Sequence, residues 1–386
     1  MPIFTRMSSV RERLYYFWKK ASEKQSRKKF EADNNKDDIE RFNACTDKKP
    51  AGRIKAEMKA LQQYWNCYPY QYYRFDFFRA DCTLSLEEMK QYIPHFFIMS
   101  LYFPHSYKEY GVLCEDKLLT YATLKAYAVS QPKMLFCFDH KTFFDSANNP
   151  LSPEALDTLI KNCTADKLFI KPRFGLGGRG IEVFNKHAGS FVNEAKNGLD
   201  HSYLLNNLKD GFYVVQEGLV QHEAMNTLYP HSVNTFRVMT ECINGKVNVL
   251  YALVRMGSGG QQIDNASSGG LYIKIDPETG VLAERAFAFN RLTFDKHPDT
   301  GFVFNKAKIA VWAEAKAFTI GVARKFREIK YMGWDIAFTK DGPSVIELNN
   351  APGIGIIQDC YGGIRDDLKI NPKDWWYKSN YTIKNL

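Results

Sequence analysis

The sequence of 386 residues lacks the features that mark membrane-spanning, secreted and zinc-binding proteins. No apolar run reaches the roughly 20 residues that a transmembrane helix needs. The first twenty residues carry charges where a secretory signal would have its apolar stretch. The eight cysteines are scattered, with no CxxC pair and no Cys/His cluster at zinc spacing. We therefore expect reduced thiols in the core of a cytoplasmic protein.

Nucleic-acid-binding motifs are also missing, although the net charge is +9. No helix-turn-helix, zinc finger or RNP-like segment is present, so we expect no nucleic-acid partner. Much of the positive excess lies near the N-terminus, where apolar residues fall near one helical face. Residues 1–30 could form a helix at an anionic membrane surface, peripheral to the inner membrane, or a helix docked on the protein itself. Both interpretations remain open at this point.

The composition that is present suits a large folded protein with more than one lobe. Hydrophobic residues make up 45% of the chain and aromatic residues 15%, so the core should be rich in Phe and Tyr. Residues 53–130 look helical, and Ser85 with Glu88 fits a capping box. After about residue 130, short β-like runs alternate with helix-like segments, which predicts an α+β fold built mostly from antiparallel hairpins.

These changes of texture suggest five segments. They are a basic amphipathic segment and linker (1–52), a helical N-terminal region (53–130), a first lobe (131–220), a second lobe (221–370) and a C-terminal tail (371–386).

A glycine-rich hairpin follows one β-like run. Lys171 stands at the end of the run LFIK, and the glycines after it, among them Gly177 and Gly178, let backbone N–H groups approach an anion. The loop also satisfies GxGxxG, but the run IEVF after it reads as a strand rather than the helix of a dinucleotide fold. It lacks the GK[ST] of a Walker A loop. A phosphate-facing hairpin and an ordinary glycine hairpin are the two interpretations.

A second hairpin, GWDIAFTKDGPSVIELNN, carries an oxygen-rich set of side chains. Glu347 and Asn349 are two residues apart on a β-like run and share one face, while Asp335 lies on the preceding strand. Two carboxylates and an amide oxygen suit Mg²⁺. A three-residue loop, 340–342, would pair position 335 with 347 and place all three on one side. A solvated surface hairpin is the alternative.

Two arginines lie in β-like runs between these hairpins. Arg237 is inside NTFRVMT, and Arg255 ends NVLYALVR. An arginine buried in a sheet needs an anion, which could be a carboxylate of the protein or a bound phosphate. A site for phosphoryl transfer would use such cations to stabilise the charge that develops on the phosphate.

Taken in order, these segments resemble the ATP-grasp superfamily, and in particular its sugar-transfer associated subfamily, over roughly residues 110–365. The resemblance implies an ATP-grasp fold in which two α+β lobes clasp ATP, preceded here by a helical N-terminal region without a clear three-layer domain. It also implies the following nucleotide-binding residues: Lys117 and Lys171, the loop glycines Gly177 and Gly178, the adenine-facing linker with Gln216, Glu217 and Leu219, and Glu217 or Glu223 at the ribose.

The resemblance further implies that Asp335, Glu347 and Asn349 hold two Mg²⁺ ions, with Mn²⁺ as an alternative metal. Arg237 would steady the transferred phosphate, with Arg255 as its helper. The implied reaction couples a small-molecule or sugar carboxylate to an amine through an acyl phosphate, with a role in cell-surface polysaccharide assembly or modification. A kinase and a nucleotide-binding module without catalysis are the alternatives, because both would use the same nucleotide residues.

Overall fold

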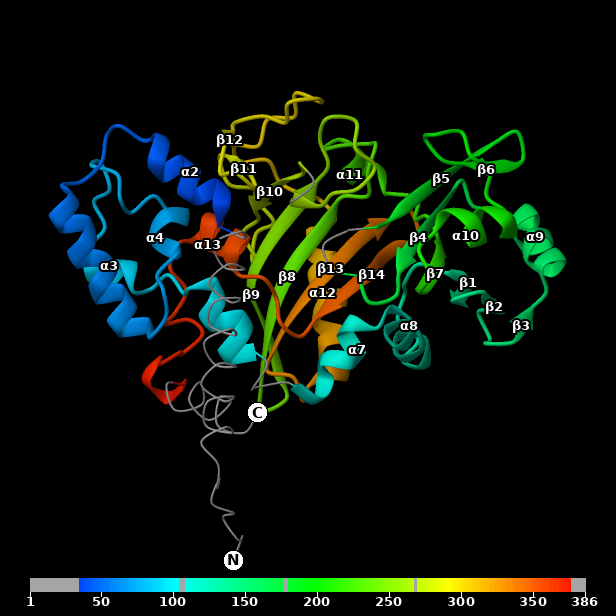
Figure 1. Cartoon of the computed structure of the whole chain (residues 1–386), viewed down its shortest axis with the longest axis horizontal. Helices are drawn as coiled ribbons and strands as arrows, with labels where there is room; N and C mark the ends of the chain where they lie inside the picture. The colour runs from blue at the N-terminus through cyan, green and yellow to red at the C-terminus, as the bar shows by residue number, and fades with distance from the viewer. Residues whose placement is uncertain (1–34, 104–107, 176–179, 267–268, 376–386) are drawn as a thin grey trace, which may run out of the picture. The chain divides into compact units, whose positions relative to one another are not determined.

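The computed structural model describes residues 35–103, 108–175, 180–266 and 269–375 (Figure 1). The chain divides into two compact units, one of residues 1–105 and 361–386 and one of residues 106–360. None of the described helices is long and apolar enough to cross a membrane. The basic segment 1–30, the glycines Gly177 and Gly178 and the end of the C-terminal tail lie outside the described residues.

The first unit is helical. Its elements are α2 (Lys36–Ala44), α3 (Ala51–Trp65), α4 (Gln71–Arg74), α5 (Leu86–Met89) and the π-helix η1 (Phe97–Tyr102). The expected capping box is present, since the Ser85 hydroxyl accepts a hydrogen bond from the Glu88 N–H and the Glu88 carboxylate accepts one from the Ser85 N–H. The aromatic core predicted from composition is also found, with members Leu61, Tyr72, Phe75, Phe77, Phe78 and Met89.

The second unit begins with short helices and a first antiparallel sheet. The helices are η2 (Lys108–Tyr110), α7 (Gly111–Glu115) and α8 (Lys117–Ala126). Within the described residues the sheet has the order β3 (Pro150–Leu151), β2 (Thr142–Asp145), β1 (Met134–Asp139), β7 (Phe212–Glu217), β4 (Lys167–Pro172), β5 (Glu182–His187) and β6 (Ser190–Val192).

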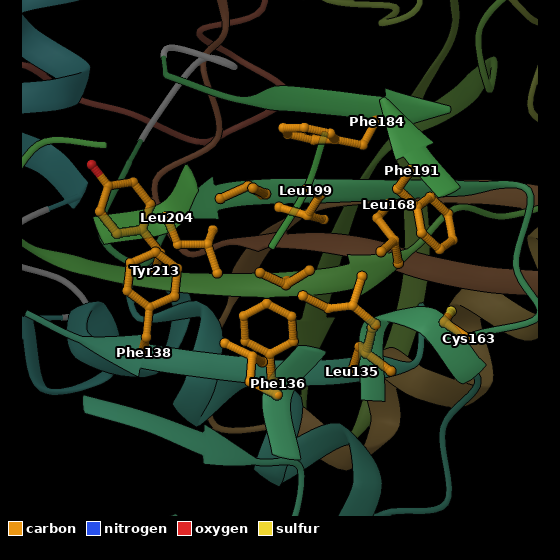
Figure 2. Close-up of a cluster of buried hydrophobic side chains, with 14 of the residues drawn as sticks. Leu135, Phe136, Phe138, Cys163, Leu168, Phe184, Phe191, Leu199, Leu204 and Tyr213 are labelled. Atoms are coloured by element: carbon orange, nitrogen blue, oxygen red, sulfur yellow. The ribbon is translucent and has the colours of Figure 1, made fainter. Parts of the chain in front are cut away.

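One face of this sheet carries the lobe's main core. Leu168 and Ile170 of β4 point into it, together with side chains of α9 (Pro153–Asn162) and α10 (His201–Asn207). Figure 2 shows Phe136, Phe138 and Leu168 gathered in this cluster. Because side chains alternate along a strand, Phe169 and Lys171 must face the opposite side, where α8 packs through Leu118. Burying one face in this way leaves the other available for polar groups.

A second antiparallel sheet forms the rest of the unit. Its order is β12 (Thr293–Phe294), β11 (Ala286–Ala288), β10 (Leu271–Lys274), β9 (Lys246–Met256), β8 (Thr235–Ile243), β13 (Tyr331–Thr339) and β14 (Gly342–Asn349) among the described strands. The helical elements of this part are α11 (Glu223–Asn226), α12 (Trp312–Ala323), η4 (Arg324–Phe326) and α13 (Gly355–Tyr361). The expected α+β architecture of antiparallel hairpins is confirmed.

Two helix boundaries have local causes. α12 begins only at Trp312, because residues 303–309 bridge to other segments through backbone hydrogen bonds. The helix at α5 stops at Met89, ahead of Pro94, whose ring lacks the N–H that a continuing helix needs.

A fully buried histidine fixes the chain where β9 ends. Nδ1 of His297 accepts from the N–H groups of Asp299 and Thr300 at 3.2 and 3.4 Å, so it carries no proton. Its Nε2 therefore carries the proton and donates to the Gly257 carbonyl at 2.9 Å. Burial lowers the pKa of this imidazole, because the charged form loses its hydration. The ring thus holds the segment that follows Arg255.

This histidine predicts a pH-dependent part of the stability. A group whose pKa is lowered by folding stabilises the protein fully above its unfolded pKa of about 6.5, and that stabilisation is lost as the pH falls through the folded pKa. His297→Gln should cost about 1–2 kcal/mol at pH 7.5, and the gap in melting temperature to the wild type should narrow toward pH 5.5. His140→Gln is the matched control, because the hydrogen bond to Asp210 raises the pKa of that exposed ring. For this variant, the gap in melting temperature to the wild type should widen as the pH falls toward 5.5. If the difference in melting temperature between His297→Gln and the wild type did not change with pH, the buried imidazole would not be held in its neutral form.

Candidate functional site

Charged side chains form a row across β8, β13 and β14 of the second sheet. Asp335 on β13 lies opposite Arg237 on β8 and opposite Glu347 on β14. Directly opposed residues in antiparallel strands share a face, so these three side chains emerge on the same side of the sheet. Asn349 is two residues beyond Glu347 and joins them on that side.

The offset that pairs Asp335 with Glu347 arises away from the turn. Thr339 pairs directly with Gly342, so the connection is shorter than the three-residue loop expected from the sequence. That register, continued, would place Glu347 on the other face. A β-bulge between Asp335 and Ile336 shifts the register by one residue and restores the pairing. The pairing was predicted correctly, but its assignment to the loop was wrong.

Both arginines contact the buried carboxylate of Asp335. The Arg237 guanidinium donates from Nε to Oδ1 and from a terminal nitrogen to Oδ2, the latter at 3.0 Å. A terminal nitrogen of Arg255 lies 3.1 Å from the same Oδ2. Of the two anions considered from the sequence, the structure thus places a carboxylate of the protein beside Arg237. Its partner, however, is one of the residues predicted to bind metal.

The two carboxylates of the row have opposite pKa shifts. Burial acts to raise the pKa of Asp335, but the charges of Arg237 and Arg255 outweigh it and hold the pKa low. The pKa of Glu347 is raised, first by burial and then by the negative charge of Asp335 beside it. Asp335 is thus a stable carboxylate, whereas the charges of Arg237, Lys117 and Arg255 only partly offset the burial of ionised Glu347 and its repulsion by Asp335.

The donor set fits a divalent cation. Glu347 forms no hydrogen bond or salt bridge with any residue in the described part of the chain, and the Asn349 side-chain nitrogen is buried without a partner. A cation between Asp335 and Glu347 would relieve the repulsion between them, and their hard oxygen ligands suit Mg²⁺. Three His, Cys, Asp or Glu side chains do not come together as a metal site anywhere in the described residues. Any metal here would therefore rest on two carboxylates and an amide.

Lys171 of the first sheet projects from the face opposite the hydrophobic core. Its Nζ donates to Oε1 of Gln216 on β7 at 2.9 Å. Burial lowers the pKa of Lys171 to about 8, and the positive charge of Lys117 adds to this effect. The charges of Glu347 and Asp264 act in the opposite direction, so Lys171 lies within electrostatic reach of the second sheet.

Lys117 is held at the start of α8 by a buried ion pair that sequence analysis missed. Asp116 caps α8 and accepts two hydrogen bonds from Arg173, at 2.7 and 2.6 Å. The Lys117 N–H donates to the Arg173 carbonyl, and its Nζ donates to the carbonyl of Gly175. An aspartate directly before a helical run is an N-cap pattern, so the pair DK could have revealed the cap, although not the ion pair with Arg173.

The segment after β7 connects the two sheets. Glu217 pairs with Lys133 at 2.7 Å, which engages one of the two carboxylates considered for the ribose. Glu223 is exposed in the first turn of α11, and Leu219 is half-buried. Gly218 lies against β4, where an added Cβ would come within 2.8 Å of the Lys167 side chain. A glycine is therefore required for the chain to leave the sheet here.

A cavity of about 150 Å³ lies where Leu118 of α8 meets the first sheet. It is lined by Leu118, Cys137, Phe138, Asp139, Phe144, Asn148, Arg173 and Tyr213. Lys171, Gln216 and Glu347 do not line it, so it is separate from the charged row.

Comparison with known proteins decides the family. The sequence model of the sugar-transfer associated ATP-grasp family matches residues 100–368. The chain belongs to this family. The resemblance and the ATP-grasp fold expected from the sequence are thus confirmed for this ATP-grasp protein. No curated protein matches the chain.

Solved structures similar to this ATP-grasp chain share little sequence with it. An N5-carboxyaminoimidazole ribonucleotide synthetase in complex with ADP is 11% identical, with a TM-score of 0.37 over 62% of this chain and 45% of its own. D-alanyl-alanine synthetase A from Vibrio cholerae is 10% identical, with a TM-score of 0.40 over 68% and 65%. VanG D-Ala:D-Ser ligase from Enterococcus faecalis is 15% identical, with a TM-score of 0.39 over 67% and 61%. The chain spans less than two thirds of each of these proteins.

The burial of Glu347 beside Asp335 predicts that its charge lowers the stability of the metal-free protein. Glu347→Gln removes a charge that burial and Asp335 disfavour, so the ATP-grasp protein should melt higher in EDTA at pH 7.5, by about 2–4 °C per kcal/mol relieved. The difference should vanish below about pH 4, where the carboxyl group is protonated in both states. Glu284→Gln, at an exposed glutamate, is the control for charge removal. A lower melting temperature for Glu347→Gln would show that Lys117 and the arginines stabilise the ionised form more than Asp335 disfavours it.

Proposed function

We propose that this protein is an ATP-dependent ligase, which activates a carboxylate as an acyl phosphate and couples it to an amine with release of ADP. The observation that carries the proposal is the row Arg237–Asp335–Glu347 on one face of the second sheet. A cation beside two neighbouring carboxylates can bind a polyphosphate together with its metal ions.

The lysines of the first lobe supply further positive charge. Lys171 is partly buried, and among the described residues its side chain is hydrogen-bonded only to the neutral amide of Gln216, so its charge remains available to an anion. Lys117 donates to a backbone carbonyl and has no carboxylate within hydrogen-bonding distance in the part of the chain that the structure describes. In this proposal the two ammonium groups hold the phosphates, and the segment from Gln216 to Leu219 lies along the adenine.

The proposed chemistry has two steps. A carboxylate oxygen of the substrate attacks the γ-phosphorus, the bond to the β–γ bridging oxygen breaks, and ADP leaves. An amine then attacks the carbonyl carbon of the acyl phosphate, phosphate leaves, and the amine loses a proton to solvent. Asp335, Glu347 and Asn349 would hold Mg²⁺, which neutralises phosphate charge when bound. Arg237 and Arg255 would stabilise the charge on the transferring group, so catalysis rests on positioning and electrostatics.

The substrates proposed are a small-molecule or sugar carboxylate and an amine. The family's description as sugar-transfer associated supports a role in the assembly or modification of a cell-surface polysaccharide. None of the described helices could span a membrane, and the proposed reaction needs none. The metal proposed for it is Mg²⁺ or Mn²⁺.

A screen by ADP release tests the function. The full-length protein is incubated with Mg-ATP, amino acids and uronic acids in pairs, and products are identified by mass spectrometry. We expect ADP together with an amide, and Glu347→Gln should lose at least 100-fold in turnover while remaining folded. ADP with a phosphorylated substrate would instead identify a kinase. Nucleotide binding without turnover on any pair would favour a binding module.

The pKa of Lys171 predicts a pH dependence of nucleotide binding. With a pKa of about 8 in the free protein, the ammonium group loses its charge as the pH rises, so affinity for ATP should fall between pH 7.5 and 9 by up to about tenfold. Lys171→Arg keeps its proton throughout this range and should give a flatter profile. Calorimetry over the range measures both. A flat profile for the wild type would contradict contact between Lys171 and a phosphate.

A further inference from the structure

Arg255 is shared between two carboxylates. A terminal nitrogen of its guanidinium lies 3.1 Å from Oδ2 of Asp335 and 3.3 Å from Oδ2 of Asp264. Its Nε donates to the Thr235 hydroxyl at 3.1 Å, and that hydroxyl donates in turn to Asp264. The arginine side chain is 11% exposed, so it depends on protein anions rather than on water.

The segment that carries Asp264 is built close to the end of β9. Gly270, just before β10, faces the Asp264 carbonyl so closely that an added Cβ would come within 2.7 Å of it. Thr235 on β8 is directly opposite Arg255 on β9, which sets the hydroxyl beside the guanidinium. The contact between Asp264 and Arg255 is therefore fixed by strand register on one side and by a tight loop on the other.

A metal ion would compete for one of these contacts. Oδ2 of Asp335 receives both arginines, and a divalent cation on the same carboxylate would repel any guanidinium that stays beside it. Arg237 is the direct cross-strand partner of Asp335 and has no second carboxylate within ion-pair distance in the described residues. Arg255 does have one, because Asp264 remains beside it when Asp335 changes partner.

From this geometry, and resting on the function proposed above, we infer that Asp264 and Thr235 are positioning residues that retain Arg255 at the site when Asp335 takes up a metal ion. They let the cation displace the guanidinium from Asp335 without expelling it from the site. Neither residue need contact the metal or the nucleotide itself.

Mn²⁺ binding in a double-mutant cycle tests this inference. The affinity of the full-length protein for Mn²⁺, saturated with a non-hydrolysable ATP analogue, is measured by the electron paramagnetic resonance of free Mn²⁺. Asp264→Asn should lower this affinity by about tenfold, because Arg255 then depends on Asp335 alone. In an Arg255→Met background, Asp264→Asn should change it by less than about twofold.

The result that overturns the inference is additivity. If Asp264 acts through its own negative charge, Asp264→Asn will weaken Mn²⁺ binding equally in both backgrounds. An unchanged affinity for Asp264→Asn alone would overturn the inference as well. A wild-type protein that binds no Mn²⁺ with the analogue would overturn the proposed function together with it, whereas additivity in a protein that binds Mn²⁺ removes the inference alone.

Thr235 offers a second set of variants should Asp264→Asn fold poorly. Thr235→Ser keeps the hydroxyl and should bind Mn²⁺ as the wild type does. Thr235→Val removes the hydroxyl link between Arg255 and Asp264 but leaves their direct contact, so it should weaken binding in the same direction as Asp264→Asn and by less. Melting temperatures in EDTA check that every variant is folded. Equal Mn²⁺ affinities for the serine and valine variants would contradict the role of the hydroxyl.

Discussion

Asp335 carries a negative charge at a fully buried strand position, and the charged face of the second sheet is organised around it. A buried carboxylate is costly unless cations and hydrogen bonds compensate it. Arg237 and Arg255 supply that compensation from the adjacent strands β8 and β9. The same contacts explain why neither arginine is expelled from a sheet interior. Loss of Asp335 would leave Arg237 without a carboxylate among the described residues, whereas Arg255 would keep Asp264.

Strand register places the side chains of Glu347 and Asn349 on the same face as the compensated carboxylate of Asp335. The identities of Asp335, Glu347 and Asn349 were readable from the sequence, because alternation along a strand fixes which residues share a face. The bulge was not readable, since the extra residue on β14 is Ile346 and no glycine or proline marks it. Both a loop and a bulge satisfy the same parity. Only the backbone hydrogen bonds distinguish them, and these depend on how the two strands pack against their neighbours.

In the first lobe, a contact between residues far apart in the sequence decides the position of a candidate site residue. Lys171 and its glycine loop stand out in the sequence, yet the contact that fixes Lys117 joins Asp116 to Arg173, 57 residues apart in the chain. Sequence patterns report neighbours along a strand or a helix, so the N-cap at Asp116 was within reach. Its ion pair with Arg173 was not, because it depends on the packing of α8 against the sheet. The helical unit was predicted in type, through its capping box and aromatic residues, but not in its helix ends.

The balance of charge limits what the second unit can bind. Among the described residues, Lys117, Lys171, Arg237 and Arg255 supply positive charge to this face, and Asp264, Asp335 and Glu347 supply negative charge. A polyphosphate alone would meet the negative charge of Glu347, and a metal ion alone would meet the two arginines on Asp335. Bound together, the cation can take the carboxylates while the phosphates take the arginines and lysines. The face is therefore suited to a metal–polyphosphate pair more than to either component.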